Sequence, residues 1–341
     1  MTRSELTRLG GFSAAVVLLH VAGFGLFVYY LPSNPALAGL ASLAYTFGLR
    51  HAFDADHIAA IDNTTRKFLQ DGKRSMGVGF FFSLGHSSIV FGLTAGLAIA
   101  AKSVSSSIPA LQRYGSTVGV SVSGTFLLVI GALNLLVLLE VVGVFRRMKS
   151  GTYKEDDLES ALVKQGFLSR VLLKRLGSKI DASWKMYPLG LLFGLGFDTA
   201  TEITLLAVAA GVATHHVPFL AVVSLPLIFA AGMSLMDTAD GAFMSYAYGW
   251  AFSSPVRKVF YNISVTSLSV AVAWMVGGIE LLQVLAAKLS LHGGLWRLLE
   301  SIDLGHLGYI VVALFAAMWL LSLTVWKTAR IEQRWTQPNS S

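Results

Sequence analysis

The sequence predicts an all-α, polytopic membrane protein with eight transmembrane helices. Of its 341 residues, 54% are hydrophobic and only 13% are charged, about half the charged fraction of a typical soluble domain. Apolar stretches of about 20 residues, the length that crosses a bilayer core of about 30 Å, recur along the chain. Lysine and arginine residues gather in alternate connections between these stretches, which is the pattern of a membrane topology.

The apolar stretches define the eight helices and their order. The predicted helices span residues 12–31, 37–61, 76–101, 115–143, 187–212, 217–249, 259–286 and 305–326. The first stretch carries no formal charge and no small-residue cleavage site follows it, so we expect an anchor and not a cleaved signal peptide.

The second, fifth and sixth helices are expected to be interrupted within the membrane. Each contains acidic residues with glycine close by: Gly48 in the second, Gly194 and Gly196 in the fifth, Gly232 and Gly241 in the sixth. Irregular backbone is tolerated at membrane depth only where it faces protein or a cavity. We therefore expect these helices to line the interior of the bundle.

The basic residues predict the orientation. The N-terminus, the connections 62–75, 144–186 and 250–258, and the tail together hold 21 of the 26 lysine and arginine residues. The positive-inside rule then places both termini in the cytoplasm of a protein in the cell (inner) membrane. The predicted parts are a first bundle (1–143), a cytoplasmic loop (144–186), a second bundle (187–326) and a cytoplasmic tail (327–341).

A short internal similarity suggests an inverted repeat. The segment FGLRHAFDADHI at 47–58 resembles FGLGFDTATEI at 193–203, and the helices that contain them run in opposite directions across the membrane. If helices two to four are related to helices five to seven, the result is a 3+3 inverted repeat. Many secondary transporters use such a repeat to place a binding site at the membrane midplane.

The strongest functional signal is a cluster of polar residues inside the second helix: Arg50, His51, Asp54, Asp56 and His57. A charged side chain at the centre of a bilayer costs roughly 2.5–3.5 kcal/mol, so such residues are rare and usually functional. Imidazole and carboxylate together are ligands of borderline divalent metal ions. The cluster therefore predicts a metal site.

Helix geometry limits how this site can form. On a regular helix His51 and His57 are about 9 Å apart along the axis, whereas metal–nitrogen bonds measure about 2.0–2.1 Å. Either the helix unwinds after Gly48, or the two histidines belong to successive sites that share Asp54. A purely structural role for buried, satisfied histidines is the alternative to both.

Other helices offer further ligands. His86 lies in the third helix, Asp198 and Glu202 share a face of the fifth, and Asp237 and Asp240 share a face of the sixth. Buried acid pairs repel each other unless a cation, protons or Arg50 neutralise them. The predicted metal-site residues are therefore His51, Asp54, Asp56, His57, His86, Asp198, Glu202, Asp237 and Asp240. The chain contains no cysteine, which excludes thiolate sites and Fe–S clusters.

Four segments resemble the nickel–cobalt transporter (NiCoT) family of permeases. They are RHAFDADHI (50–58), FFFSLGHSSIV (80–90), LGFDTATEI (195–203) and GMSLMDTADGAFM (232–244). His51, Asp56 and His57 match the H-x4-D-H signature of the second helix in that family. The resemblance implies eight helices and selective uptake of Ni²⁺ or Co²⁺ by a single polypeptide without ATP hydrolysis. The absence of a G-x4-G-K-[ST] motif agrees.

These observations predict a secondary transporter, not an enzyme, which takes up divalent nickel and/or cobalt using the membrane potential or a proton gradient. Its expected partners are the metal ion, as substrate, and membrane lipid, with no resident cofactor and no nucleic acid. A divalent metal exporter of related architecture and, less favoured, a membrane di-iron oxidase are the alternatives. The 144–186 loop contains no histidine, unlike the histidine-rich loop of many exporters, which favours uptake.

Overall fold

The computed structural model describes residues 3–35, 37–73, 75–104, 108–149, 181–195, 218–251, 255–302 and 304–328, and all regular secondary structure within them is helical. The helices are α1 (Arg3–Tyr30), α2 (Leu37–His51), α3 (Ala55–Gln70), α4 (Val78–Val104), α5 (Ile108–Lys149), α8 (Met186–Gly194), α10 (Phe219–Ala251), α11 (Pro255–Leu289), α12 (Gly294–Glu300) and α13 (Leu304–Thr328), with short 3₁₀ turns at Leu31–Ser33 and Ser183–Lys185. The prediction of an all-α membrane protein is confirmed.

Among the described residues, six helices are long and apolar enough to cross a membrane: α1, α4, α5, α10, α11 and α13. Each overlaps one predicted span. The fifth predicted span begins as α8, but its continuation through 196–217, including Asp198 and Glu202, lies outside the described residues. The predicted total of eight helices therefore stays a prediction.

The predicted second helix differs most from the structure. It consists of two helices, α2 of 15 residues and α3 of 16 residues, separated at Ala52–Asp54. At about 1.5 Å per residue neither half is long enough to cross a bilayer alone, whereas the two in succession are long enough. The predicted 62–75 connection was wrong over most of its length, because α3 continues to Gln70. The polar side chains from Asp62 to Lys67 are buried in the bundle and are not solvated in a loop.

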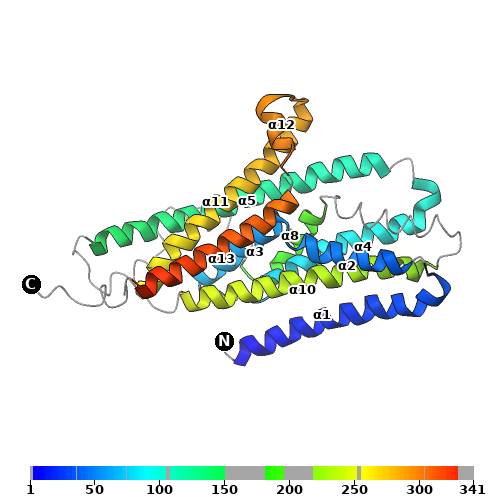
Figure 1. Cartoon of the computed structure of the whole chain (residues 1–341), viewed down its shortest axis with the longest axis horizontal. Helices are drawn as coiled ribbons and strands as arrows, with labels where there is room; N and C mark the ends of the chain where they lie inside the picture. The colour runs from blue at the N-terminus through cyan, green and yellow to red at the C-terminus, as the bar shows by residue number, and fades with distance from the viewer. Residues whose placement is uncertain are drawn as a thin grey trace, which may run out of the picture.

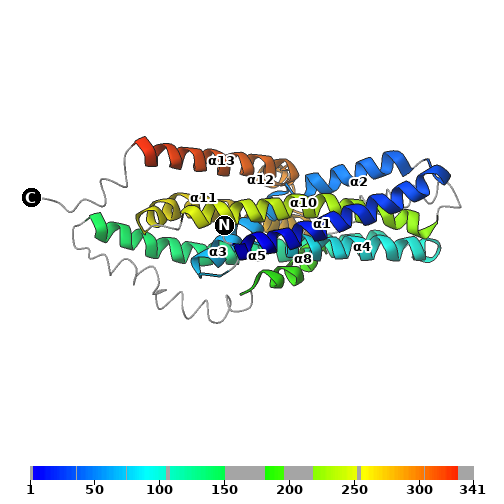
Figure 2. The same ribbon diagram turned by 90° about the horizontal axis from the view of Figure 1, so that it is seen from below.

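The helices lie alongside one another in an elongated bundle (Figure 1). Figures 1 and 2 place the C-terminal ends of α5 and α13 and the beginning of α11 toward the same end of the bundle. The long helix α10 packs against α1, α2, α3 and α4, while α5 packs against α11 and α4 against α8. Helices from both halves of the sequence thus contribute to one packed interior.

Small residues bring the backbones into direct contact around this interior. A Cβ atom at Gly48 would overlap the carbonyl oxygen of Phe229, and one at Gly79 would overlap that of Asp237. Glycine therefore lets α2 and α4 approach α10 closely, the type of packing common between membrane helices. These approaches fix the parts of α2, α4 and α10 that carry the predicted ligands.

The bundle buries polar side chains inside and exposes apolar side chains outside. On α1 and α13, for example, Leu18 is 67% exposed and Leu320 is 63% exposed. Such apolar outer faces are expected of helices that contact lipid. Phe68, Phe82 and Leu127, by contrast, belong to a buried core, and the ring of Phe82 lies 4.8 Å from that of His57.

Candidate metal site

The site is built around the break between α2 and α3. The N–H of Phe53 donates to the carbonyl of Arg50 and that of Asp54 to the carbonyl of His51, both at 2.9 Å. The break packs on α13, where a Cβ at Gly308 would overlap the carbonyl oxygen of Phe53. A neighbouring helix thus supports the irregular backbone, as a membrane interior requires. The unwinding expected after Gly48 occurs three residues later, after His51.

This break brings three histidine rings together. The centroids of His51 and His57 are 4.5 Å apart, and His86 from α4 lies 4.7 Å and 4.8 Å from them. One ligand nitrogen from each ring lies within 4.8 Å of the others. His57 is 0% exposed and His86 is 5% exposed. The sequence left two arrangements open: an unwound helix with one site, or a regular helix with two successive sites. The structure has the first, with His51 and His57 side by side.

A carboxylate contacts one nitrogen of each of two rings. Asp54 Oδ2 lies 2.6 Å from His51 Nδ1, and Asp237 Oδ2 lies 3.3 Å from His57 Nδ1. The Nε2 atoms therefore face the cluster, where His51 Nε2 and His86 Nε2 are 3.1 Å apart. Within the described part of the chain, the buried Nε2 of His57 has no hydrogen-bond partner. A carboxylate on one ring nitrogen with the other free for metal is a common arrangement around metal-binding histidines.

The side chain of Asp54 contacts His51 and does not cap helix α3. It is the N-cap residue of α3, yet its side chain makes no capping hydrogen bond. Such a cap typically stabilises a helix by about 0.5–2 kcal/mol. Asp56 compensates in part, because its Oδ1 accepts the N–H of His57 at 2.9 Å.

The two helix ends also favour a cation. The C-terminus of α2 presents partial negative charge at the break, and Asp54 and Asp56 offset the positive N-terminus of α3. Helix ends and side chains therefore act together to make the break attractive to positive charge.

The acids of α10 have buried carboxylate oxygens, whereas Arg50 is exposed. Asp237 is fully buried, and its Oδ1 is without a hydrogen-bond partner among the residues described. Asp240, one turn further along α10, has a buried Oδ2 that is likewise unpaired in that part of the chain. Arg50 is exposed at the end of α2, so it is not enclosed with the acids of α10. Asp198 and Glu202 are outside the described residues.

Four buried charged residues were not predicted as part of the site: Asp62, Arg66 and Lys67 on α3 and Glu280 on α11. Glu280 on α11 is 2% exposed and accepts a hydrogen bond from Ser123 at 3.0 Å. Asp62 and Arg66 form a fully buried ion pair on α3. A lone acid in the apolar 259–286 stretch was a usable signal for Glu280. The i, i+4 spacing of Asp62 and Arg66 was a signal for the ion pair.

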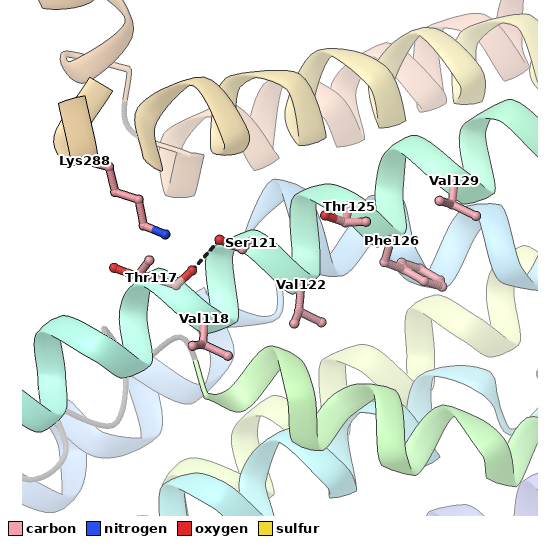
Figure 3. Close-up of a pocket in the computed structure, with 8 residues that line it drawn as sticks. All are labelled: Thr117, Val118, Ser121, Val122, Thr125, Phe126, Val129 and Lys288. Atoms are coloured by element: carbon pink, nitrogen blue, oxygen red, sulfur yellow. Dashed lines mark hydrogen bonds between the residues drawn. The ribbon is translucent and has the colours of Figure 1, made fainter. Parts of the chain in front are cut away.

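A separate cavity of about 570 Å³ runs along α5 near the end of α11 (Figure 3). Its walls are hydroxyl and apolar side chains, and Lys288 extends toward Thr117 and Ser121. The ammonium group of Lys288 would repel a cation. This cavity is therefore not a second metal site.

The fold and the cluster define a class: a multi-pass helical membrane protein that encloses three histidines with paired carboxylates. The sequence model of one family, described as high-affinity nickel-transport protein, matches residues 37–325. The chain belongs to this family, which confirms the resemblance indicated by the four motifs.

Named nickel and cobalt transport proteins align with nearly the whole chain. The nickel transporter NicT of Mycobacterium tuberculosis is 50% identical, with 98% of this chain and 93% of the relative covered. The nickel transporter NixA of Staphylococcus aureus is 48% identical, with 95% and 96% covered. The cobalt transport protein NhlF of Rhodococcus rhodochrous is 43% identical, with 93% and 92% covered. No solved structure matches the chain.

Proposed function

We propose that this protein takes up Ni²⁺ and/or Co²⁺ across the cytoplasmic membrane as a secondary transporter. The observation that supports this most is the buried cluster of His51, His57 and His86 at a helix break, in a chain of the nickel-transport family. Relatives named for nickel transport and for cobalt transport support both ions as candidate substrates.

The distances between ring nitrogens suit one ion. Two ligands at about 2.0–2.1 Å from a metal, at angles between octahedral and tetrahedral, are separated by roughly 2.9–3.4 Å. The 3.1 Å between His51 Nε2 and His86 Nε2 falls in this range. The ligand nitrogen of His57 lies within 4.8 Å of the other two, so it needs to approach them by at most roughly 1.4 Å to share the ion. Imidazole is also a suitable ligand for nickel.

We assign different roles to the predicted residues. The three histidines bind the ion directly, and Asp54 and Asp237 orient His51 and His57 while contributing negative charge. Asp56 and Asp240, and on the fifth span Asp198 and Glu202, complete or relay the site. The double charge of the ion offsets the cost of keeping several carboxylates away from water.

The orientation follows the positive-inside pattern. In this proposal both termini are cytoplasmic, including the 327–341 tail. The 144–186 loop, which connects the bundles 1–143 and 187–326, is cytoplasmic as well. Helix α2 then enters from outside, and its last residue His51 meets the incoming ion. The membrane potential favours inward movement by about 2.3 kcal/mol per charge per 100 mV, which doubles for a divalent ion. An inverted repeat of helices two to four and five to seven would provide alternating access.

Accumulation of ⁶³Ni²⁺ and radioactive cobalt in cells that express the protein tests this function. Wild-type cells should accumulate the ion above cells without the protein, and His57→Ala should reduce accumulation at least about tenfold. His292→Ala is the matched control, because His292 is exposed and outside the cluster. Lower metal content in expressing cells than in control cells would indicate the alternative, an exporter. Equal accumulation by His57→Ala and wild type, at equal expression, would refute the site.

A further inference from the structure

A second buried polar network lies beyond the histidine cluster on α3. Arg66 Nη2 donates to both carboxylate oxygens of Asp62 at 3.1 Å and to the hydroxyl of Tyr248 at 2.8 Å. Tyr248 and Ser269 donate to Asp62, and Arg66 Nη1 donates to Thr266 at 3.3 Å. Tyr248 is 2% exposed and the other four residues are fully buried. The network therefore joins α3, α10 and α11 out of reach of solvent.

Its position along the bundle follows from two contacts between parallel helices. His57 on α3 contacts Asp237 on α10, and nine residues further along α3 Arg66 contacts Tyr248, which is eleven residues further along α10. At about 1.5 Å per residue these steps correspond to roughly 13 Å and 16 Å. The network is thus the next charged layer toward the C-terminal end of α3.

Asp240 connects the two layers. It lies on α10 one turn after Asp237 and eight residues before Tyr248, and its Oδ2 atom is buried. The acidic side chains therefore continue from the histidine cluster as far as Asp62, where the guanidinium of Arg66 is the first positive charge.

Exposure differs on the two sides of the cluster. On the α2 side, the side chains of His51 and Asp54 are 16% and 22% exposed. On the α3 side, Asp62 and Arg66 are 0% exposed. The histidine cluster is therefore partly exposed on its α2 side in this conformation, whereas the network is fully enclosed.

Taken with the proposed transport function, on which this inference rests, we propose that Asp62, Arg66 and Tyr248 form the inner gate of the metal pathway. Arg66 neutralises Asp62 and repels an oncoming cation while the gate is closed. Because Asp62 and Arg66 share one helix and their partners lie on α10 and α11, movement of α3 away from these helices opens the layer. An ion that then reaches Asp62 displaces the guanidinium from the carboxylate.

A single-cysteine experiment tests this gate directly, because the chain has no cysteine of its own. Ala60→Cys places a thiol on α3 between His57 and Asp62, at a position that is 0% exposed. Its rate of modification by a membrane-impermeant thiol reagent is measured in right-side-out and inside-out vesicles. Arg66→Gln should raise the cytoplasmic-face rate at least tenfold and leave the outer-face rate unchanged.

Two further variants separate gating from misfolding. Tyr248→Phe keeps the ion pair and the ring and removes one hydroxyl, so it should raise the cytoplasmic-face rate by a smaller factor. Tyr246→Phe is the control, because Tyr246 is 57% exposed on the same helix, and it should change neither rate. An unchanged rate in both gate variants, or an equal rise on both faces, would overturn the gate.

The labelling experiment needs no metal, so it fails independently of the proposed function. If wild-type protein accumulates neither nickel nor cobalt but Arg66→Gln opens only the cytoplasmic face, the transport function is wrong and the gate stands. If uptake is demonstrated but labelling rises equally from both faces, the transport function stands and the gate is wrong.

Discussion

Replacement of Asp237 by asparagine isolates the contribution of one buried carboxylate to metal binding. The side chain keeps its shape, but the carboxylate that lies 3.3 Å from His57 Nδ1 becomes a neutral amide. Both residues are 0% exposed, so solvent does not replace the lost interaction. Loss of such an orienting carboxylate typically weakens metal binding 10- to 100-fold, or about 1.4–2.8 kcal/mol.

The assay is equilibrium binding of ⁶³Ni²⁺ to purified protein in detergent, over a range of metal concentrations. We expect Asp237→Asn to raise the dissociation constant 10- to 100-fold while the number of bound ions per chain at saturation is unchanged. Asp181→Asn is the matched control: Asp181 pairs with Lys185, but its side chain is 45% exposed, and exposed pairs contribute about 0–1 kcal/mol. A wild-type dissociation constant in Asp237→Asn would refute the orienting role of this carboxylate.

Three other changes have expected outcomes. Asp54→Ser should weaken nickel binding about tenfold but not lower the melting temperature, because serine restores the N-cap of α3 while the contact with His51 is lost; a preserved affinity would contradict this. Gly79→Leu should destabilise the protein by more than about 1 kcal/mol in thermal unfolding, since its side chain would overlap the Asp237 backbone, whereas Gly92→Leu, with open space around it, should not. Lowering the pH from about 7 to about 5 should weaken nickel binding and binding should release protons, because protons compete for imidazole nitrogens; pH-independent binding would exclude histidine ligands.

Much of the fold could be predicted because the length of an apolar stretch is enough to identify a membrane-spanning helix. Six predicted spans correspond to long helices of the structure. The same reasoning misplaced the end of the second span, because polarity after Ile61 resembles a loop when hydropathy alone is considered. Asp62 and Arg66 are buried because they pair with each other and with Tyr248 and Ser269, which are 186 and 207 residues away from Asp62 in sequence. A single sequence does not reveal such pairing.

The composition of the candidate site was predictable, but its geometry was not. Histidines and acids inside an apolar stretch indicated a metal site, and the 9 Å axial separation of His51 and His57 on a regular helix required either a break or two sites. Only the packed structure shows that the break follows His51, where Phe53 contacts Gly308 of α13. The pairing of Asp237 with His57 likewise depends on the approach of α10 to α3 and had no sequence signal.

X-ray absorption spectroscopy of the nickel-loaded protein tests most directly whether three imidazoles bind one ion. The wild-type spectrum should show three histidine nitrogens at about 2.0–2.1 Å, and His86→Ala should show two. Nickel coordinated by oxygen alone in the wild type, or the same number of histidine ligands in His86→Ala as in the wild type, would contradict binding by three imidazoles.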